Sequence, residues 1–530
     1  MEMRKYLLFI TAIFLGFIMI ACSSDSNGSP EDTEDTNSTP DNEDTTESSE
    51  ATNSSDDVDT LVIGLDDDPP QLDPHRSSAA VDRQTFQSLF NKLIDIDEEL
   101  NYVPELATDW EVSDDELVYT LTLQEGVLFH DGTSFNAEAV KFNFERMLDL
   151  DLSSPRQSEV NLVSEVNVID DYEVEIVLSE PFAPFLSVLT DRAGMMVSPT
   201  AVEELGDDFQ NQPVGSGPYE FVERVAQDKI ELTRFEDYWG EIPAIENVVI
   251  RPYGDEDVRI TNLVSGEVDL VNKVAFKDIE KLEEDPNITL MEQDSIGHQG
   301  VHLNTRTAPF DNKQVRQAFN YAIDRTAITE VVFHNGAVPS VSAFAPPSWA
   351  NPDFEQPHAD VEKAKALLAE SGMEDVSFSL MIRPTPEEEQ MAQMMQSMLG
   401  EVGITMEVEM IEFGTMLDKL DSGDFEAARL GWSGRVDPDG NVYHYYKTDA
   451  SNNYTGYSSP KVDELLDNAR TVSDQDERAS MYKEMAEILW DDAPFIFMYH
   501  ELDYKAMKSN VKGFKHIPDT MVRTHSIYFE

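Results

Sequence analysis

The stretch at residues 106–148 reads LATDWEVSDDELVYTLTLQEGVLFHDGTSFNAEAVKFNFERML, and it carries most of what the sequence says about the fold. Apolar and polar residues alternate over residues 118–122, which is the period of a β-strand. The glycines and charged residues of 126–132 interrupt that pattern as a turn would. Residues 137–148 then repeat apolar side chains at helical spacing. A strand, an irregular connection and a helix in close succession predict a mixed α/β domain.

Similar patterns recur before and after this stretch. Residues 61–65 predict a strand, and a helix is expected from Asp82, where apolar residues recur at i, i+3, i+4 and i+7. Asp311 is predicted to cap a second helix, whose apolar stripe is Val315, Ala318, Phe319, Ala322 and Ile323. Four methionines at helical spacing, Met391, Met394, Met395 and Met398, are interpreted as core packing rather than as a metal site.

Residues 106–148 also resemble the signature of the large extracellular solute-binding proteins that serve oligopeptide, dipeptide and nickel ABC importers. Further similar motifs lie at residues 215–219, 238–240, 265–269, 309–319 and 457–463, so the resemblance covers roughly residues 60–520. It implies an α/β fold of the two-lobed periplasmic-binding-protein type (class II), with a hinge between lobes that close over a ligand.

The resemblance also implies a division of the chain. Lobe I is expected to combine residues 59–99, 213–300 and 500–530, with an inserted subdomain at 100–212, and lobe II to comprise residues 301–499. In front of these, residues 1–22 are interpreted as a lipoprotein signal peptide and residues 23–58 as a disordered acidic tether.

The N-terminal segment is predicted to direct the protein out of the cell. Arg4 and Lys5 precede an apolar run that is too short to span a membrane comfortably. Ala21 then precedes Cys22, as in the lipobox of bacterial lipoproteins, so we expect cleavage before Cys22 and a lipid (palmitate among the acyl chains) on that residue. An uncleaved signal anchor is the alternative. Because the chain has 1 cysteine, an internal disulfide is excluded.

Charge narrows the possible partners. The chain carries 105 acidic and 37 basic residues, a net charge of −68, which would repel a nucleic-acid backbone. Residues 23–58 contain no basic residue and hardly an apolar one, which favours a solvated spacer over an acidic interaction tail. We expect a protein that tolerates high salt or alkaline surroundings, because salt screens its self-repulsion.

The candidate ligand site rests on the resemblance. In peptide-binding relatives the ligand lies as an added strand between two edges, and these match Ser78, Ala79 and Ala80 on one side and Trp432, Ser433 and Gly434 on the other. Arg383 roughly matches the position that holds a ligand carboxylate in dipeptide-binding relatives.

Arg435 is where this chain departs from its relatives. It stands at the position where peptide-binding relatives have an aspartate for the α-ammonium of the ligand. Either Asp437 or Asp439 takes over the ammonium, or Arg435 binds an anionic group of a different ligand, or Arg435 pairs with those aspartates and points away.

Catalysis and metal binding find little support. His130 and Asp131 are adjacent residues at a predicted turn, and adjacent side chains seldom point at one reacting atom. His298 and His302 lie in a strand-like setting and lack the HExxH pattern of a zinc helix. Asp437 and Asp439 lack the remaining ligands of an EF-hand. We therefore expect no enzyme activity, no cofactor and no resident metal.

The function expected is that of a lipid-anchored, monomeric binding protein on the outer face of the cell membrane. It would capture a peptide or peptide-like solute between its lobes and deliver it to the permease subunits of an ABC importer. An anionic non-peptide solute, such as an opine, a glutathione-like compound or a nickel chelate, is the alternative, as is a lipid-anchored sensor or chaperone that uses the same cleft.

Overall fold

A computed structural model describes residues 59–352 and 359–530, and residues 56–530 form a unit separate from residues 1–55. The predicted signal peptide, Cys22 and the tether lie outside the described residues. Among the described helices, none combines the length and apolar character that crossing a membrane requires.

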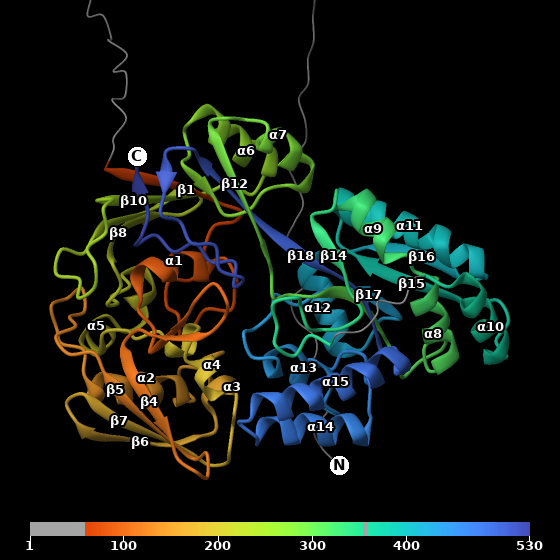
Figure 1. Cartoon of the computed structure of the whole chain (residues 1–530), viewed down its shortest axis with the longest axis horizontal. Helices are drawn as coiled ribbons and strands as arrows, with labels where there is room; N and C mark the ends of the chain where they lie inside the picture. Colours follow the sequence, from red (N-terminus) through yellow and green to blue (C-terminus); the bar gives the residue numbers. More distant parts are fainter. Residues whose placement is uncertain (1–58, 353–358) are drawn as a thin grey trace, which may run out of the picture. The chain divides into compact units, whose positions relative to one another are not determined.

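A large mixed sheet runs through both lobes (Figure 1). In the described part of the chain its main path is β16 (Thr405–Met410), β15 (Ser377–Ile382), β17 (Ala427–Arg429), β13 (Gln299–Leu303), β18 (Phe495–Lys508), β11 (Leu270–Val271), β1 (Thr60–Leu65), β10 (Asn247–Pro252), β9 (Lys229–Arg234) and β8 (Tyr219–Val225). Two more strands, β12 (Ile288–Asp294) and β14 (Ala337–Pro339), pair with β18 off this path.

The strand β18 connects the two lobes. Its first residues pair with β13 in the second lobe, and residues 502–508 pair with β12 in the first lobe. The chain therefore crosses between lobes twice, at residues 295–298, which join β12 to β13, and at residues 499–502 within β18. We call these the crossing segments. A hinge of this kind can rotate with small changes in a few backbone dihedrals.

The first lobe is built around the buried strand β1. It pairs in parallel with β10 and with β11, and strands covered on both faces read as continuous apolar runs, as TLVIGL does. Helix α1 (Asp82–Leu89) packs Phe86 and Leu89 into the same core, in agreement with the predicted helix at Asp82. The remaining helices of this lobe include α6 (Glu256–Ser265) and α7 (Ile279–Glu283).

A separate four-stranded antiparallel sheet forms within residues 107–178, in the order β4 (Ala107–Val112), β5 (Val118–Leu123), β7 (Glu173–Leu178) and β6 (Val163–Asp170). Helix α2 (Ala137–Leu148) buries Val140, Phe144 and Met147 against it. Asn136 caps this helix by accepting the N–H of Ala139 at 3.1 Å. The strand and helix predicted from the opening stretch are thus confirmed. Further short elements here are β2 (Ile94–Ile96), β3 (Tyr102–Pro104), α3 (Gln157–Val160), α4 (Phe185–Val188) and α5 (Pro199–Leu205).

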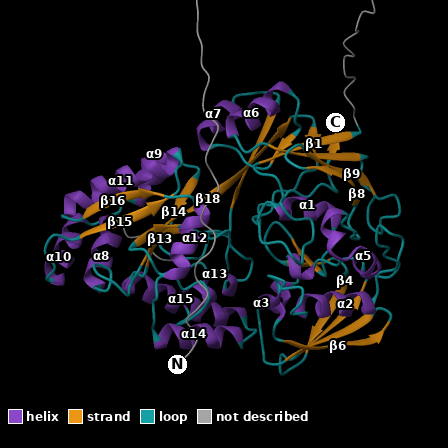
Figure 2. Ribbon diagram, turned by 180° about the vertical axis from the view of Figure 1, so that it is seen from behind, coloured by secondary structure: helices purple, strands orange, loops and turns teal. Residues whose placement is uncertain are grey.

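The second lobe packs helices against the strands β13 to β17 (Figure 2). These helices are α8 (Lys313–Ala322), α9 (Arg325–Val332), α10 (Val361–Ser371), α11 (Pro386–Val402), α12 (Phe413–Ser422), α13 (Asp439–Tyr446), α14 (Pro460–Arg470) and α15 (Gln475–Asp492). Met391 and Met395 are buried in this core, and Met394 and Met398 pack against it, as expected for core methionines.

Two local predictions need correction. The cap of α8 is Asn312, not Asp311: the Asn312 side chain accepts the N–H of Gln314 at 2.9 Å. From the sequence, residues 431–441 are also expected to form a turn throughout, but α13 begins at Asp439 within that stretch. The lobe boundaries stay a prediction.

Candidate ligand site between the two lobes

A cavity of about 460 Å³ lies beside the crossing segments, between the two lobes. Its lining from the first lobe is Ala80, Lys273, Asp503 and Thr520, from the crossing segments Ser295, Gly297, Glu501 and Leu502, and from the second lobe Gln299, Arg383, Phe413, Arg429, Leu430, Gly431, Trp432 and Ser433. This volume falls within the range of small-molecule sites, ~300–1,000 Å³.

The turn that contains Trp432 is fixed against a crossing segment. The N–H of His298 donates to the carbonyl of Trp432 at 3.0 Å, and the N–H of Trp432 donates back at 2.8 Å. Glycine makes this approach possible, since a Cβ on Gly297 would lie 2.6 Å from the Trp432 carbonyl oxygen. Gly434 has φ +84° and is equally crowded by Ile296. Trp432 and Ser433 line the cavity, whereas Gly434 is buried beneath the turn.

The predicted edge in the first lobe is held by buried polar groups. The hydroxyl of Ser77 donates to Asp82 at 2.7 Å, and Arg192 donates to the carbonyl oxygens of Ser77 and Ala79 at 3.3 and 3.5 Å. Ser78 and Ala80 are exposed and Ala79 is half-buried. Of the three predicted residues, Ala80 lines the cavity.

Two arginines on the wall of the second lobe share one buried carboxylate. Arg383 donates to Glu388 at 3.1 Å, and Nε of Arg429 lies 3.8 Å from the other Glu388 oxygen. Arg429 also donates to Gln299 at 2.9 Å and to the hydroxyl of Tyr499. Burial alone would lower the pKa of Arg429, but Glu388, Tyr499 and Glu501 raise it. The two guanidinium groups can donate charge-assisted hydrogen bonds to a ligand carboxylate.

The structure does not bring Asp437 to this cavity. Its two carboxylate oxygens accept hydrogen bonds from Arg478 at 2.7 and 2.8 Å, inside the second lobe. Asp439 is held in the same way by Arg470, with both distances 2.8 Å. These aspartates neutralise arginines of their own lobe, so neither is free to receive a ligand ammonium.

Arg435 faces the other lobe instead of pairing with these aspartates. Its Nε lies 4.0 Å from the carboxylate of Asp191, and its guanidinium stacks 4.5 Å from the centre of the Trp432 ring. It also donates to the carbonyl of Gly434 at 2.7 Å. Burial lowers the pKa of Arg435, while Asp191 opposes that effect. Arg435 is not among the residues that line the cavity.

Five lining residues with charged or aromatic side chains were not anticipated from the sequence: Lys273, Phe413, Arg429, Glu501 and Asp503. They come from segments far apart in the chain and meet because β18 and its neighbours converge at the crossing segments. Phe413 is 47% exposed, so it offers an apolar face to the cavity. The sequence offered one signal for these residues: Arg429 is a charged residue within the mostly apolar run EAARLGW, and a charge in a buried strand often has a function.

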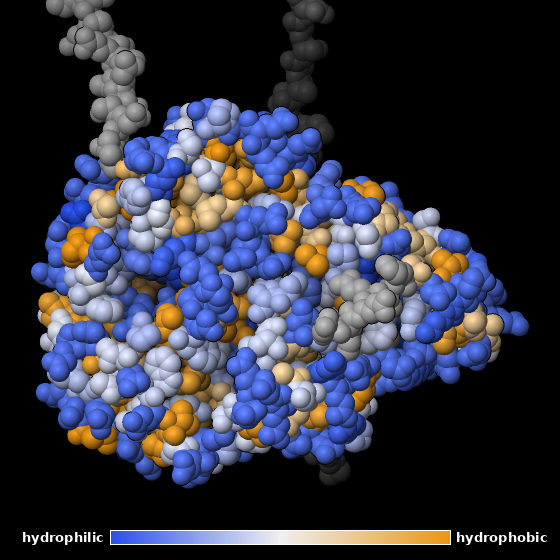
Figure 3. Space-filling view, in the orientation of Figure 1, coloured by the Kyte–Doolittle hydropathy of each residue, from blue (hydrophilic) through white to orange (hydrophobic). Residues whose placement is uncertain are grey.

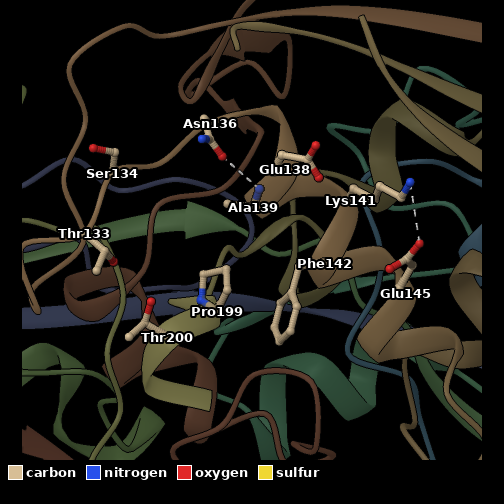
Figure 4. A pocket seen from close by; sticks show the side chains of 10 residues that line it. All are labelled: Thr133, Ser134, Asn136, Glu138, Ala139, Lys141, Phe142, Glu145, Pro199 and Thr200. Carbon is tan, nitrogen blue, oxygen red and sulfur yellow. Dashed lines mark hydrogen bonds and ion pairs between the residues drawn. The ribbon is translucent and has the colours of Figure 1, made fainter. Parts of the chain in front are cut away.

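A second hollow of about 310 Å³ lies between α2 and α5 (Figure 4). Its charged side chains are Glu138, Lys141 and Glu145, and Lys141 lies 4.0 Å from Glu145. Across residues 59–352 and 359–530, no three His, Cys, Asp or Glu side chains gather as metal ligands.

Comparison with known proteins identifies the family. The model of the bacterial extracellular solute-binding proteins, family 5 (middle region), matches residues 101–454. The glutathione-binding protein GsiB of Escherichia coli K12 is 31% identical over 478 residues, 87% of this chain and 92% of the relative.

Solved structures agree with that assignment. The periplasmic binding protein DppA of Helicobacter pylori, in complex with the peptide STSA, gives a TM-score of 0.78 at 29% identity and covers 89% of this chain and 98% of DppA. The ABC transporter substrate-binding protein CtaP of Listeria monocytogenes gives a TM-score of 0.82 at 25% identity, with coverages of 89% and 99%. The chain therefore belongs to family 5 of the bacterial extracellular solute-binding proteins, the substrate-binding proteins of ABC importers.

Proposed function

We propose that the chain captures a short peptide-like solute with at least one free carboxylate and delivers it to an ABC permease. The observation that carries this proposal is the pair Arg383 and Arg429, which share the single carboxylate of Glu388 beside the cavity. Both guanidinium groups can donate charge-assisted hydrogen bonds to a ligand carboxylate.

The relatives support a peptide-like ligand. The E. coli relative is named for glutathione, a tripeptide with two carboxylates, and the H. pylori relative was solved with the peptide STSA. Both ligands carry a free carboxylate and a free ammonium. The volume of about 460 Å³ is at the small end of ligand sites and favours a short peptide over a long one.

The environments of three buried histidines favour a binding protein over an enzyme. His130 lies with Nε2 3.0 Å from the carbonyl of Gly217, and burial lowers its pKa to about 4. Burial lowers the pKa of His298 and of His302 to about 3, and both rings pack against aromatic side chains. None of the three lines the cavity. Neutral, enclosed rings of this kind serve packing rather than acid–base chemistry.

The protein acts at the membrane surface in this proposal. Cleavage before Cys22 and lipidation of its thiol would hold the folded body outside the cell, and residues 23–58 would serve as the spacer. Each buried CH₂ of an acyl chain contributes about 0.8 kcal/mol to membrane binding, so two or three chains suffice for a stable anchor. A monomer is proposed, as one copy contributes both walls of the cavity.

Native mass spectrometry of the folded body, residues 59–530, would identify a co-purified solute, and calorimetry would then test the carboxylate contact. The probes are Ala-Ala-Ala, reduced glutathione and the C-terminal amide of Ala-Ala-Ala. We expect amidation to weaken binding roughly 10–100-fold, because a charge-assisted hydrogen bond contributes about 1.5–3 kcal/mol.

Variants locate that contact. Arg383→Ala should weaken binding of the free acid by a similar factor and abolish the penalty of amidation. The control is Arg251→Ala, an exposed arginine of β10 that does not line the cavity. Failure of both free-acid peptides to bind, together with recovery of an opine or a nickel chelate by mass spectrometry, would contradict the proposal.

A further inference from the structure

The lining of the cavity contains a carboxylate without a direct partner among the described side chains. Glu501 lines the cavity from the crossing segment of β18, and its side chain makes no hydrogen bond or ion pair with any described residue, although its charge raises the pKa of Arg429. Lys273, on the first-lobe side, likewise makes no side-chain hydrogen bond or ion pair with a described residue. The site therefore presents groups of both signs to whatever it binds.

The backbone holds Glu501 in place although its side chain is free. Its carbonyl accepts a hydrogen bond from the hydroxyl of Ser295 at 2.7 Å, which ties the two crossing segments together. In the sheet, Glu501 lies opposite Ala337 of β14. The residue is half-buried, so its carboxylate is anchored at the hinge while its oxygens remain accessible from the cavity.

Asp503 is the other carboxylate in the lining, and it is already neutralised. Lys505 donates to its two oxygens at 2.8 and 2.5 Å, and a ring nitrogen of His516 lies at 2.7 Å. Burial alone would raise the pKa of Asp503, but Lys505 and His516 lower it below its ordinary value. A ligand cation would have to compete with a buried lysine there, whereas Glu501 makes no direct ion pair within the described residues and interacts with Arg429 only at longer range.

We propose that Glu501 receives the α-ammonium of the solute while the Arg383 and Arg429 wall receives its carboxylate. This inference rests on the proposed function and specifies its substrate class: solutes with a free amine at one end and a free carboxylate at the other. Glu501 lies on β18 and Arg383 follows β15, with β17 and β13 between them in the sheet, so the two residues approach the cavity from different strands.

Selectivity follows from the same arrangement. A solute whose amine is acylated would cover Glu501 without neutralising it and would leave a carboxylate stripped of water in a closed cleft. The site would therefore discriminate against blocked amines more strongly than a neutral pocket of the same shape. This discrimination belongs to Glu501 alone among the lining carboxylates, because Asp503 keeps its lysine in either case.

The test compares Ala-Ala-Ala and reduced glutathione with their N-acetyl forms by calorimetry, in the wild type, Glu501→Gln and Asp503→Asn. In the wild type, N-acetylation should weaken binding at least 10-fold. In Glu501→Gln the free-amine peptides should lose about as much affinity as acetylation costs the wild type, and acetylation should then change the affinity less than 3-fold. Asp503→Asn should retain the acetylation penalty.

The outcomes separate this inference from the proposed function. If acetylation costs Glu501→Gln as much as it costs the wild type, Glu501 does not hold the amine and the inference is overturned, while carboxylate capture stands. The same conclusion follows if the penalty disappears in Asp503→Asn instead. If no peptide binds the wild type, the proposed function fails and the inference fails with it. The thermal melting of each variant verifies that it is folded; Glu501→Gln removes no side-chain hydrogen bond or ion pair within the described residues.

Discussion

Arg435 of the second lobe reaches Asp191 of the first lobe, with Nε 4.0 Å from the carboxylate. Asp191 also accepts a hydrogen bond from Arg83 at 3.0 Å, and Arg192 lies 3.8 Å away. Burial alone would raise the pKa of Asp191, but Arg83, Arg192 and Arg435 hold it well below its ordinary value. The carboxylate is thus a shared counter-ion at a place where the lobes touch.

A second contact lies close by in the sequence. The backbone N–H of Asp437 donates to the hydroxyl of Ser187 at 3.1 Å, again from the second lobe to the first. The Trp432 turn therefore joins three partners: the crossing segment through His298, and the first lobe through Ser187 and Asp191. The turn that lines the cavity therefore also makes contacts between the lobes, so a ligand that binds beside it can favour the closed form.

Removing Arg435 should favour the open form. Arg435→Ala is expected to weaken solute binding about 2–5-fold, because a partly exposed ion pair contributes about 0.5–1 kcal/mol. The measurement is a double-mutant cycle with Asp191→Asn, which isolates the pair from the contact of Asp191 with Arg83. Small-angle scattering of the free protein should show a larger radius of gyration for the variant. Additive effects of the two substitutions would contradict this role.

Glu388 should be essential for the stability of the second lobe. It is 4% exposed, and its loss would leave Arg429, itself 3% exposed, without its only ion pair among the described residues. Glu388→Gln is expected to lower the free energy of unfolding by about 3–5 kcal/mol, measured by urea denaturation. Glu389→Gln, one residue further along α11 and without an ion pair among the described residues, is the control and should change it by less than about 0.5 kcal/mol. Equal effects of the two substitutions would refute this account.

Acid should destabilise the fold through its buried histidines. Burial lowers the pKa to about 3 for His75, His298 and His302 and to about 4 for His130 and His500. The unfolded chain therefore binds more protons below pH ~6.5. The stability contributed by the neutral rings is complete above that pH and is lost as the pH falls toward 4. Each ring contributes a slope of up to about 1.4 kcal/mol per pH unit.

A histidine at the hinge offers a direct measurement of that slope. Nδ1 of His500 lies 2.7 Å from the carbonyl of Gly297, and Nε2 lies 2.6 Å from the hydroxyl of Ser340. Gln can replace both contacts without titrating. His500→Gln should therefore flatten the fall in unfolding free energy between pH 6.5 and 4, whereas the exposed His334→Gln should leave it unchanged. An unchanged profile in both variants would argue against a titrating His500.

Salt should stabilise the protein rather than weaken it. The chain carries a net charge of −68, and hydrophilic residues cover much of the face seen in Figure 3. Raising the ionic strength from about 0.1 to 1 M shortens the Debye length from ~10 to ~3 Å and screens this self-repulsion. The melting temperature should hold or rise from low to molar NaCl. A steady fall over that range would show that specific ion pairs outweigh the repulsion.

Lipidation of Cys22 can be tested on the full chain. Cys22→Ser should move the protein from the membrane fraction to the soluble extracellular fraction and remove labelling by a fatty-acid analogue, because the chain has no other cysteine to acylate. Ser23→Ala, next to it, should leave both readouts unchanged. Retention of Cys22→Ser in the membrane would favour an uncleaved signal anchor.

Local patterns in the sequence were sufficient to predict these helices and strands, but they did not identify every helix-capping residue. The helix at Ala137–Leu148 follows from the spacing of its apolar residues, and the methionines of α11 are core residues as their spacing indicates. The cap of α8 was misplaced by one residue because Asp311 and Asn312 are both good caps and the sequence does not say which side chain meets the free N–H groups.

The sequence by itself determined the family, the α/β class and the segment around Trp432, since long motifs and periodicity are local properties of the chain. The tertiary structure decided which charges face the ligand. Asp437 and Arg435 stand two residues apart, yet one is neutralised within its own lobe and the other reaches Asp191 in the other lobe. Arg429 and Glu501 meet at one cavity only because β17, β13 and β18 lie side by side. Pairing between distant charges depends on the fold of the whole chain, and no local pattern encodes it.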